Sequence, residues 1–486
     1  MSLPSLTSRV QLQDDDNLSN ASVPRPAGLL QLSNELIIPI IARTYHQDLV
    51  SLALSCKLLH ALAKSALRVH RALMQELSNQ TTYHNPRHFS KVLRSVLEEP
   101  GSGLYVRELV FRPSGFWSPD PGKTTDDKWL LAKAKESPFK DFIDKLVADL
   151  YGESNPGVKQ DLLRSIARGK HLPIVAFLCA ILPNLSRLEI YTYFDSVRLQ
   201  LELLDLVLQS RHLTKVDGSY FSNLRSVEIH GITGPCENTA FGILKTCAHI
   251  PSMWILVGVG FVLNGYQTKT EWVSSVKSLA LQRCAIDELT IRHMVLGMKH
   301  LKQFTYTQRD SGQRPQPRPS LGSLCAALLD CAQGTLERLE ITGLDRGILD
   351  MDTYEGCLLH FASLHDVTVE YSSLLRAQHV LNRWSCGLYA HLPDSIRKVE
   401  LDCWSLQAGY RYRPRIISCL LEVLLDESAP SLSNLECLGI ASLDERTVDN
   451  LIEARYVDRL AAAGIQLNFD NVHSPDDYSD SVPFDG

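Results

Sequence analysis

A short apolar pattern, with large apolar residues at its first, fourth and sixth positions, recurs eight times between residues 185 and 440. The copies begin at Leu185, Leu224, Val276, Leu301, Leu336, Leu364, Ile396 and Leu435. Successive side chains of a β-strand point to opposite faces. The fourth and sixth positions therefore face one side, and the residue between them faces the other. Each copy predicts a short strand with one apolar face, which it cannot bury by itself.

Helical patterns separate these strands. Apolar residues recur at helical spacing in six segments: Leu199–Leu208, Phe241–Ile250, Leu289–Met298, Leu321–Cys331, Ile416–Leu425 and Val448–Leu460. Units of strand, turn and helix stack on their neighbours and share one continuous core. We therefore expect an α/β repeat over residues 183–470, a solenoid of parallel strands with outer helices.

The strand pattern resembles that of leucine-rich repeats. The copies lie 39, 52, 25, 35, 28, 32 and 39 residues apart, whereas the family usually repeats every 20–29 residues. The resemblance therefore implies an irregular, leucine-rich-repeat-like solenoid. We expect an extra strand near Ile255–Val262, an early copy at Val106–Phe111 and a terminal strand at Ile465–Phe469. The alternative is an α/β protein whose strands merely share a pattern.

Nearer the start of the chain, residues 32–57 predict two short helices and the beginning of a third. Leu32, Leu36, Ile37, Ile40 and Ile41 form one apolar face of the first helix. Asp48 is expected to cap the second helix, where Leu49, Leu52, Ala53 and Cys56 repeat at helical spacing. Three helices in roughly 45 residues cannot bury this much aliphatic surface among themselves. Part of that surface should dock elsewhere.

The same stretch resembles an F-box, the helical module with which substrate receptors bind the Skp-type adaptor of SCF cullin–RING ubiquitin ligases. The family's opening Leu-Pro-x-Glu-Leu falls on residues 32–36, its paired aliphatics on Ile40 and Ile41, its Asp-Leu on Asp48 and Leu49, and its closing Cys-Lys on Cys56 and Lys57. Ser33 replaces the usual proline, Thr44 replaces an aliphatic residue, and Pro39 lies inside the first helix. Pro39 removes one helical hydrogen bond and is expected to bend the axis.

The resemblance implies a small three-helix F-box-like module over residues 28–77. It also implies that the module binds the adaptor through Leu32, Leu36, Ile37, Ile40, Ile41, Leu49, Leu52 and Cys56. An F-box followed by degenerate leucine-rich repeats is similar to fungal F-box proteins, which are substrate receptors without enzymatic activity. Two alternatives remain: a helical hairpin without a partner, and a leucine-rich scaffold whose first helices only cap the solenoid.

The outward positions of the predicted strands form a candidate surface for a target protein. Its members are Glu189, Glu228, Thr305, Glu340, Thr368 and Glu400, with Ala280 and Gly439 at the equivalent positions of two further strands. Four glutamates among eight positions predict an acidic stripe, hence a target with basic or hydroxyl-rich features. Tyr306, Tyr371 and Trp404 flank strand ends and could anchor a partner or cap the core.

Composition restricts the remaining possibilities. The formal net charge of -6 offers no basic field for nucleic acid or an anionic membrane. The twelve cysteines include no CxxC pair, which is typical of buried thiols in a reducing compartment. The longest apolar run, Met253–Leu263, is too short to span a membrane. We expect a soluble cytoplasmic or nuclear protein, with disordered ends at residues 1–27 and at the acidic tail 471–486.

The sequence offers no pattern for catalysis, a metal ion or a cofactor. Gly122-Lys123-Thr124 lacks the earlier glycine of a P-loop, and Gly258-x-Gly260 lacks the third glycine of a dinucleotide fingerprint. For the second pair, close backbone approach within a strand is the better explanation. A GxSxG nucleophile elbow is absent from the sequence. Residues 78–182 are predicted to form a mostly helical linker with one early strand. The remaining alternative to a substrate receptor is an enzyme with a site in the loop of residues 113–127.

Overall fold

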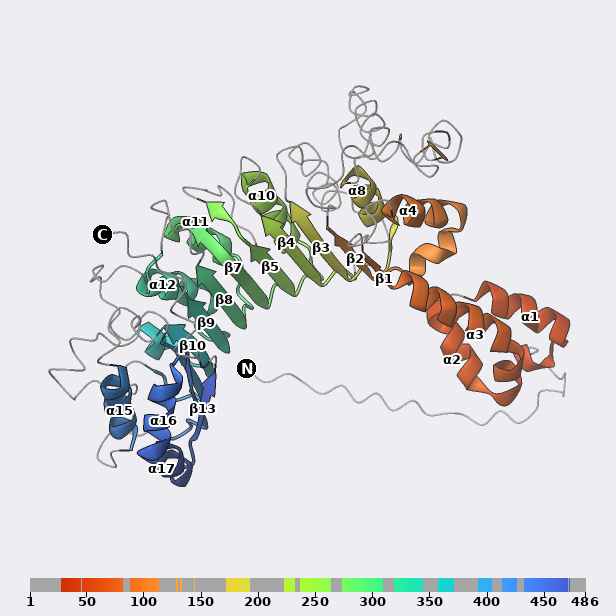
Figure 1. Ribbon diagram of the computed structural model, residues 1–486. Helices are drawn as coiled ribbons and strands as arrows, with labels where there is room; N and C mark the ends of the chain where they lie inside the picture. Colours follow the sequence, from red (N-terminus) through yellow and green to blue (C-terminus); the bar gives the residue numbers. More distant parts are fainter. Residues whose placement is uncertain are drawn as a thin grey trace, which may run out of the picture. The chain divides into compact units, whose positions relative to one another are not determined.

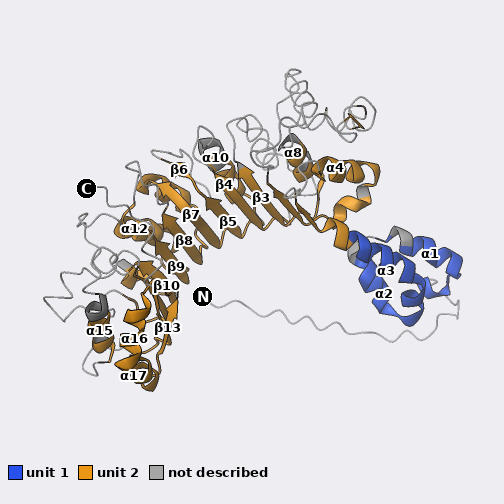
Figure 2. Ribbon diagram, in the orientation of Figure 1, with its two compact units in different colours: residues 1–73 blue, residues 74–486 orange. Residues whose placement is uncertain are grey.

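The computed structural model places the chain in two compact units, Met1–Leu73 and Met74–Gly486 (Figure 2). The structure describes residues 28–44, 46–81, 88–112, 128–129, 132, 144, 172–192, 223–231, 237–263, 273–308, 319–343, 357–370, 392–403, 413–425, 432–470 and 472. The expectations for residues 1–27, 113–127 and 199–208, and for nearly all of the acidic tail, lie outside these ranges.

The first unit is built from helices. Its elements are η1 (Leu29–Gln31), α1 (Asn34–Arg43), α2 (His46–Ser55) and most of α3 (Lys57–Leu77), whose last turn belongs to the second unit. The two short helices and the third one predicted from the sequence are present. Asp48 does not cap the second helix, because α2 already begins at His46 and Asp48 lies in its first turn. Pro39 lies inside α1.

Each of the three α-helices contributes one row of apolar side chains to the core of this unit. The rows are spaced by four residues, so their members lie one above another on a single helix face. They are Ile37 and Ile41 from α1, Leu49 and Ala53 from α2, and Leu59, Ala63 and Leu67 from α3. The core thus uses only some of the aliphatic residues in the unit.

The second unit contains one parallel sheet whose strands follow one another in chain order (Figure 1). Its strands are β1 (Asn79–Thr81), β2 (Glu108–Phe111), β3 (Arg187–Thr192), β4 (Ser226–Gly231), β5 (Ile255–Val259), β7 (Ser278–Ile286), β8 (Gln303–Gln308), β9 (Arg338–Thr342), β10 (Asp366–Glu370), β11 (Lys398–Asp402), β12 (Cys437–Ala441) and β13 (Gln466–Asp470). The short strand β6 (Val262–Leu263) pairs with β7 outside this path. The predicted α/β repeat is confirmed, and its fold is solenoid-like.

The strands are aligned so that equivalent positions of the repeated pattern pair with one another. From β2 to β13 the fourth position forms a buried ladder of Leu109, Leu188, Val227, Leu256, Leu279, Phe304, Leu339, Val367, Val399, Leu438 and Leu467. The early copy in β2, the extra strand β5 and the terminal strand β13 all join it. A stacked row of this kind buries apolar surface that a single unit could not bury.

Helices α10, α11 and α12 lie on one side of this sheet (Figure 1). The helical elements of the second unit are α4 (His88–Glu98), η2 (Pro100–Tyr105), α8 (Leu172–Ile181), α10 (Glu237–Ala248), α11 (Glu288–Val295), α12 (Leu321–Ala332), η4 (Cys357–His360), α15 (Arg413–Leu424), α16 (Glu445–Glu453) and α17 (Tyr456–Ala462). The single helix expected over Val448–Leu460 is two helices, α16 and α17. Arg455 separates them with a left-handed φ of 59°.

The sheet begins earlier than the expected boundary at residue 183, because β1 and β2 belong to it. The apolar pattern does not reveal strand β1, because the inward residue of this strand is Gln80. Gln80 pairs with Leu109 of β2 and is buried. Gln80 Nε2 donates to the Glu76 carbonyl at 2.6 Å, and His88 Nε2 lies 2.5 Å from Gln80 Oε1. A buried polar side chain with both of its ends bonded can replace an apolar one at the first rung of the sheet.

Candidate functional site

The exposed apolar side chains of the first unit form one candidate site. Leu36 and Ile40 are 55% and 39% exposed, and they lie on one face of α1 because they are four residues apart. Ile37 and Ile41, each next in the sequence, are buried in the core of the unit. Helix α1 is therefore apolar on its inner and its outer side. A helix that is apolar all round is normally covered on all sides.

The structure divides the eight residues expected to bind an adaptor into three groups. Leu36 and Ile40 are exposed, whereas Leu32, Leu52 and Cys56 are partly buried. Ile37, Ile41 and Leu49 lie in the core of the unit, which corrects the expectation that all eight face a partner. The reason is that a three-helix unit needs its own core and takes one aliphatic row from each helix.

Six further large apolar side chains in the described part of this unit are exposed and were not among the expected contacts. They are Leu30 of η1, Ile38 of α1, Val50 and Leu54 of α2, and Leu58 and Val69 of α3. A signal was present for one pair, since Val50 and Leu54 are four residues apart and lie on one face of α2. Together with Leu36 and Ile40 they are called the outer apolar residues below.

The second candidate site is the outward face of the sheet. The six residues proposed to bind a target all occupy one row, halfway between the two inward positions of their strands. Glu189 is paired with Glu228, and Thr305, Glu340, Thr368 and Glu400 follow one another across β8–β11. The backbone register thus brings together all six residues, with Val257 and Ala280 between the two groups.

The expected acidic stripe is compensated by basic side chains of the same face. Arg338 and Lys398 lie two residues before Glu340 and Glu400 on the same strands, with N–O distances of 3.9 and 3.7 Å. Arg187 stands in the same relation to Glu189 at 3.0 Å. Residues two apart on a strand point to the same face, so each pair neutralises itself. The predicted row of four glutamates is present, and three of the four have a basic residue two positions earlier on the same strand.

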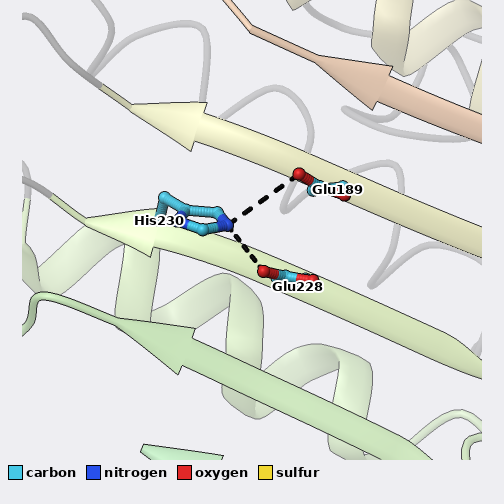
Figure 3. A group of neighbouring side chains, drawn as sticks. All are labelled: Glu189, Glu228 and His230. Atoms are coloured by element: carbon cyan, nitrogen blue, oxygen red, sulfur yellow. Dashed lines mark hydrogen bonds and ion pairs between the residues drawn. The ribbon is translucent and has the colours of Figure 1, made fainter. Parts of the chain in front are cut away.

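Glu189, Glu228 and His230 form the most polar cluster of this face (Figure 3). His230 Nε2 lies 2.7 Å from Glu228 Oε1 and 4.0 Å from Glu189 Oε1. The hydrogen bond from His230 lowers the pKa of Glu228, and Arg187 adds to this effect while desolvation opposes it. Glu189 is only 4% exposed, so it cannot act as a surface contact.

Two arginines engage the buried carboxylate of Glu189. Arg112 donates to Oε1 at 2.9 Å and Arg187 to Oε2 at 3.0 Å. The Arg112 guanidinium also stacks 4.5 Å from the ring centre of Tyr191, and that ring stacks on His230 at 3.8 Å. Burial, followed by hydrogen bonding to Glu189, raises the pKa of Tyr191 above its ordinary range.

This cluster can offer three ligand atoms to a cation, all within 4.8 Å of one another. A cation would have to displace guanidinium groups from both oxygens of Glu189. The arrangement is therefore an ion-pair network that stabilises the face where β3 meets β4, since buried charges are stable when paired. Sequence reasoning missed Arg112, which follows β2 and lies 77 positions before Glu189.

The structure describes one of the three aromatic residues expected at strand ends. Tyr306 belongs to the core, where its hydroxyl donates to the Cys284 carbonyl at 3.2 Å. Tyr371 and Trp404 lie outside the described residues. The nine cysteines whose side chains the structure describes form no disulfide with one another. None of the helices in the described part of the chain has the length and apolar character needed to span a membrane.

Neither a protein-family model nor a curated protein matches this chain.

Proposed function

We propose that the chain is an F-box substrate receptor of an SCF-type ubiquitin ligase. In this proposal the first unit binds the Skp-type adaptor and the repeat sheet binds a target protein. The observation that carries the proposal is the outer side of α1, where Leu36 and Ile40 are exposed beside a buried row of the same helix. Exposed apolar side chains gathered on a small unit are typical of an interaction surface.

The order of the two units supports the same function. A helical unit with outer apolar residues precedes an α/β repeat, as in F-box receptors with leucine-rich repeats, and we assign the repeats to a degenerate form of that type. Such a receptor performs no chemistry of its own. It raises the effective concentration of a target near a ubiquitin-conjugating enzyme that the ligase carries elsewhere. This role belongs to the cytoplasm or the nucleus.

The proposal is tested with the full chain and a purified Skp-type adaptor in a pull-down assay. The double variant Leu36→Asp/Ile40→Asp should lose adaptor binding, because carboxylates would be buried without partners at the interface. The matched control is Leu359→Asp/Ile452→Asp, which places the same charges at exposed aliphatic residues of the second unit, 45% and 51% exposed. The control should bind like the unmodified chain.

Two outcomes contradict the proposal. One is failure of the unmodified chain to retain the adaptor, and the other is retention of the adaptor by the Leu36/Ile40 variant at the level of the control. Circular dichroism of both variants shows whether the helices persist, which is expected since neither exposed side chain belongs to the core. Failure to bind favours the scaffold whose first helices only cap the solenoid.

A further inference from the structure

The edge of the sheet at which its parallel strands begin carries a row of side chains, one immediately before each strand. In the middle of the sheet this row reads Arg225, Trp254, Lys277 and Lys302, before β4, β5, β7 and β8 respectively. Backbone hydrogen bonds fix its order. The Arg225 carbonyl accepts from Trp254 N–H at 2.9 Å, the Trp254 carbonyl from Lys277 N–H at 2.9 Å, and the Lys277 carbonyl from Lys302 N–H at 2.8 Å.

Trp254 is the only exposed tryptophan among the described residues, with 44% of its surface accessible. Cations from both neighbouring strands stack on its indole. The Arg225 guanidinium carbon lies 5.0 Å and the Lys277 ammonium nitrogen 4.6 Å from the ring centre. Both distances are within the range of a cation–π contact. These contacts hold the long basic side chains beside the ring and reduce the entropy lost when a partner binds them.

All charged side chains in this middle part of the row are basic. The four edge residues and the first residues of the same strands, Ser226, Ile255, Ser278 and Gln303, include three cations and no carboxylate. Lys302 is paired with Glu337, the next residue along the edge. Among the described residues, neither Arg225 nor Lys277 forms an ion pair with a carboxylate. This contrasts with the outward face, where Arg187, Arg338 and Lys398 each lie within 4.0 Å of a glutamate.

An apolar contact accompanies the cations. Ile255 follows Trp254 and is 42% exposed. Tryptophan and arginine are the residues most enriched at the energetic centres of protein interfaces. An aromatic ring, an aliphatic side chain and two cations that pair with no carboxylate of the described residues therefore lie at the starts of three adjacent strands.

We propose that Arg225, Trp254, Ile255 and Lys277 bind an acidic polypeptide segment that carries an apolar side chain. Its carboxylates would pair with the two cations, and its apolar side chain would contact the indole edge and Ile255. A peptide fits better than a nucleic acid, because this middle part of the row offers three cations, one of them paired with Glu337, and the chain carries a net charge of -6. This inference does not depend on adaptor binding by the first unit.

The experiment selects peptides from a random twelve-residue library displayed on phage, with the full chain as bait. We expect the enriched peptides to combine aspartate or glutamate with an aromatic or aliphatic residue. Their affinity, measured by fluorescence anisotropy of labelled peptides, should fall about tenfold or more for Trp254→Ala, the loss typical of a central interface residue. Lys277→Glu should weaken binding further, and rising salt should weaken binding to the unmodified chain.

Matched controls place the same changes elsewhere in the second unit. Arg446→Glu reverses an exposed charge and Ile452→Ala removes an exposed apolar side chain, both on α16. Neither control should alter peptide affinity. Lys277→Glu keeps the test valid if Trp254→Ala impairs folding, since the lysine is exposed and outside the core.

Three results would overturn the proposal. The first is that no peptide is enriched above the level on an empty support. The second is that the enriched peptides are basic, or that they bind Trp254→Ala and Lys277→Glu with unchanged affinity. The third is that a single-stranded oligonucleotide binds more tightly than the selected peptides and depends on the same residues.

Discussion

At the residue scale, Gly258 shows how one irregular position is compensated within the repeat. It occupies the inward position that Ile229 and Leu281 fill on the neighbouring strands. A Cβ atom at Gly258 would lie 2.7 Å from the ring of Phe261, which is fully buried and packs edge-on against Phe241. The phenyl ring therefore fills the place of the missing side chain. The close backbone approach expected for Gly258-x-Gly260 is present at Gly260, just after β5, where a Cβ atom would lie 2.5 Å from the Gly231 carbonyl oxygen, whereas at Gly258 the close neighbours are side chains.

We therefore predict that restoring the repeat pattern at this position destabilises the protein. Gly258→Leu should lower the free energy of unfolding by about 2 kcal/mol, because it forces extra volume against Phe261. Combining it with Phe261→Ala should cost less than the sum of the two single changes, since the leucine then occupies the vacated space. Urea denaturation followed by circular dichroism measures all three. Strict additivity would show that Phe261 does not replace the missing side chain.

His88 makes stability depend on pH at the first rung of the sheet. Its pKa lies below the ordinary 6.5, chiefly through burial, with Lys91 adding to the effect and Glu76 opposing it. The folded state thus binds a proton less readily than the unfolded state, so this contribution is complete above pH 6.5 and is lost as the pH falls below that value. We predict that the unmodified chain loses thermal stability between pH 8 and pH 5.5 relative to His88→Asn. A constant difference between the two melting temperatures would contradict this.

At the element scale, periodicity predicted helix α1 but not which of its apolar rows faces inward. The rows Leu36–Ile40 and Ile37–Ile41 are adjacent in the sequence, and each has helical spacing. Only packing against α2 and α3 assigns the second row to the core. The outward face of the sheet shows the same limit. The alternation of residues predicted the row of glutamates, but their basic neighbours lie outside that row. One of them, Arg112, follows β2, whereas its partner Glu189 lies on β3. Side-chain pairing across strands depends on tertiary register, which a single pattern does not contain.

The two rows of α1 should respond differently to truncation. Ile37→Ala removes a fully buried side chain and should destabilise the first unit by about 2–4 kcal/mol. Leu36→Ala should change its stability by less than about 0.5 kcal/mol, as is usual for exposed positions. Native-state hydrogen exchange of the Leu59 and Ala63 amides in α3 measures the opening of this unit within the full chain. Equal effects of both changes would show that the assignment of the rows is wrong.

At the scale of the whole molecule, the order of the strands followed from the sequence because each repeat packs on the next. Such a sheet needs no long crossing connections, and its strands pair in chain order from β1 to β13. Strand β1 was missed because a buried Gln80 replaces its apolar residue, and the division between α16 and α17 was missed because Arg455 adopts a left-handed conformation that no apolar spacing reveals.

The most direct test of the account is light scattering on the full chain mixed with a purified Skp-type adaptor and separated by gel filtration. The account predicts a single complex with one copy of each protein, and the loss of that complex for Leu36→Asp/Ile40→Asp. Two separate peaks with the masses of the free proteins would contradict it.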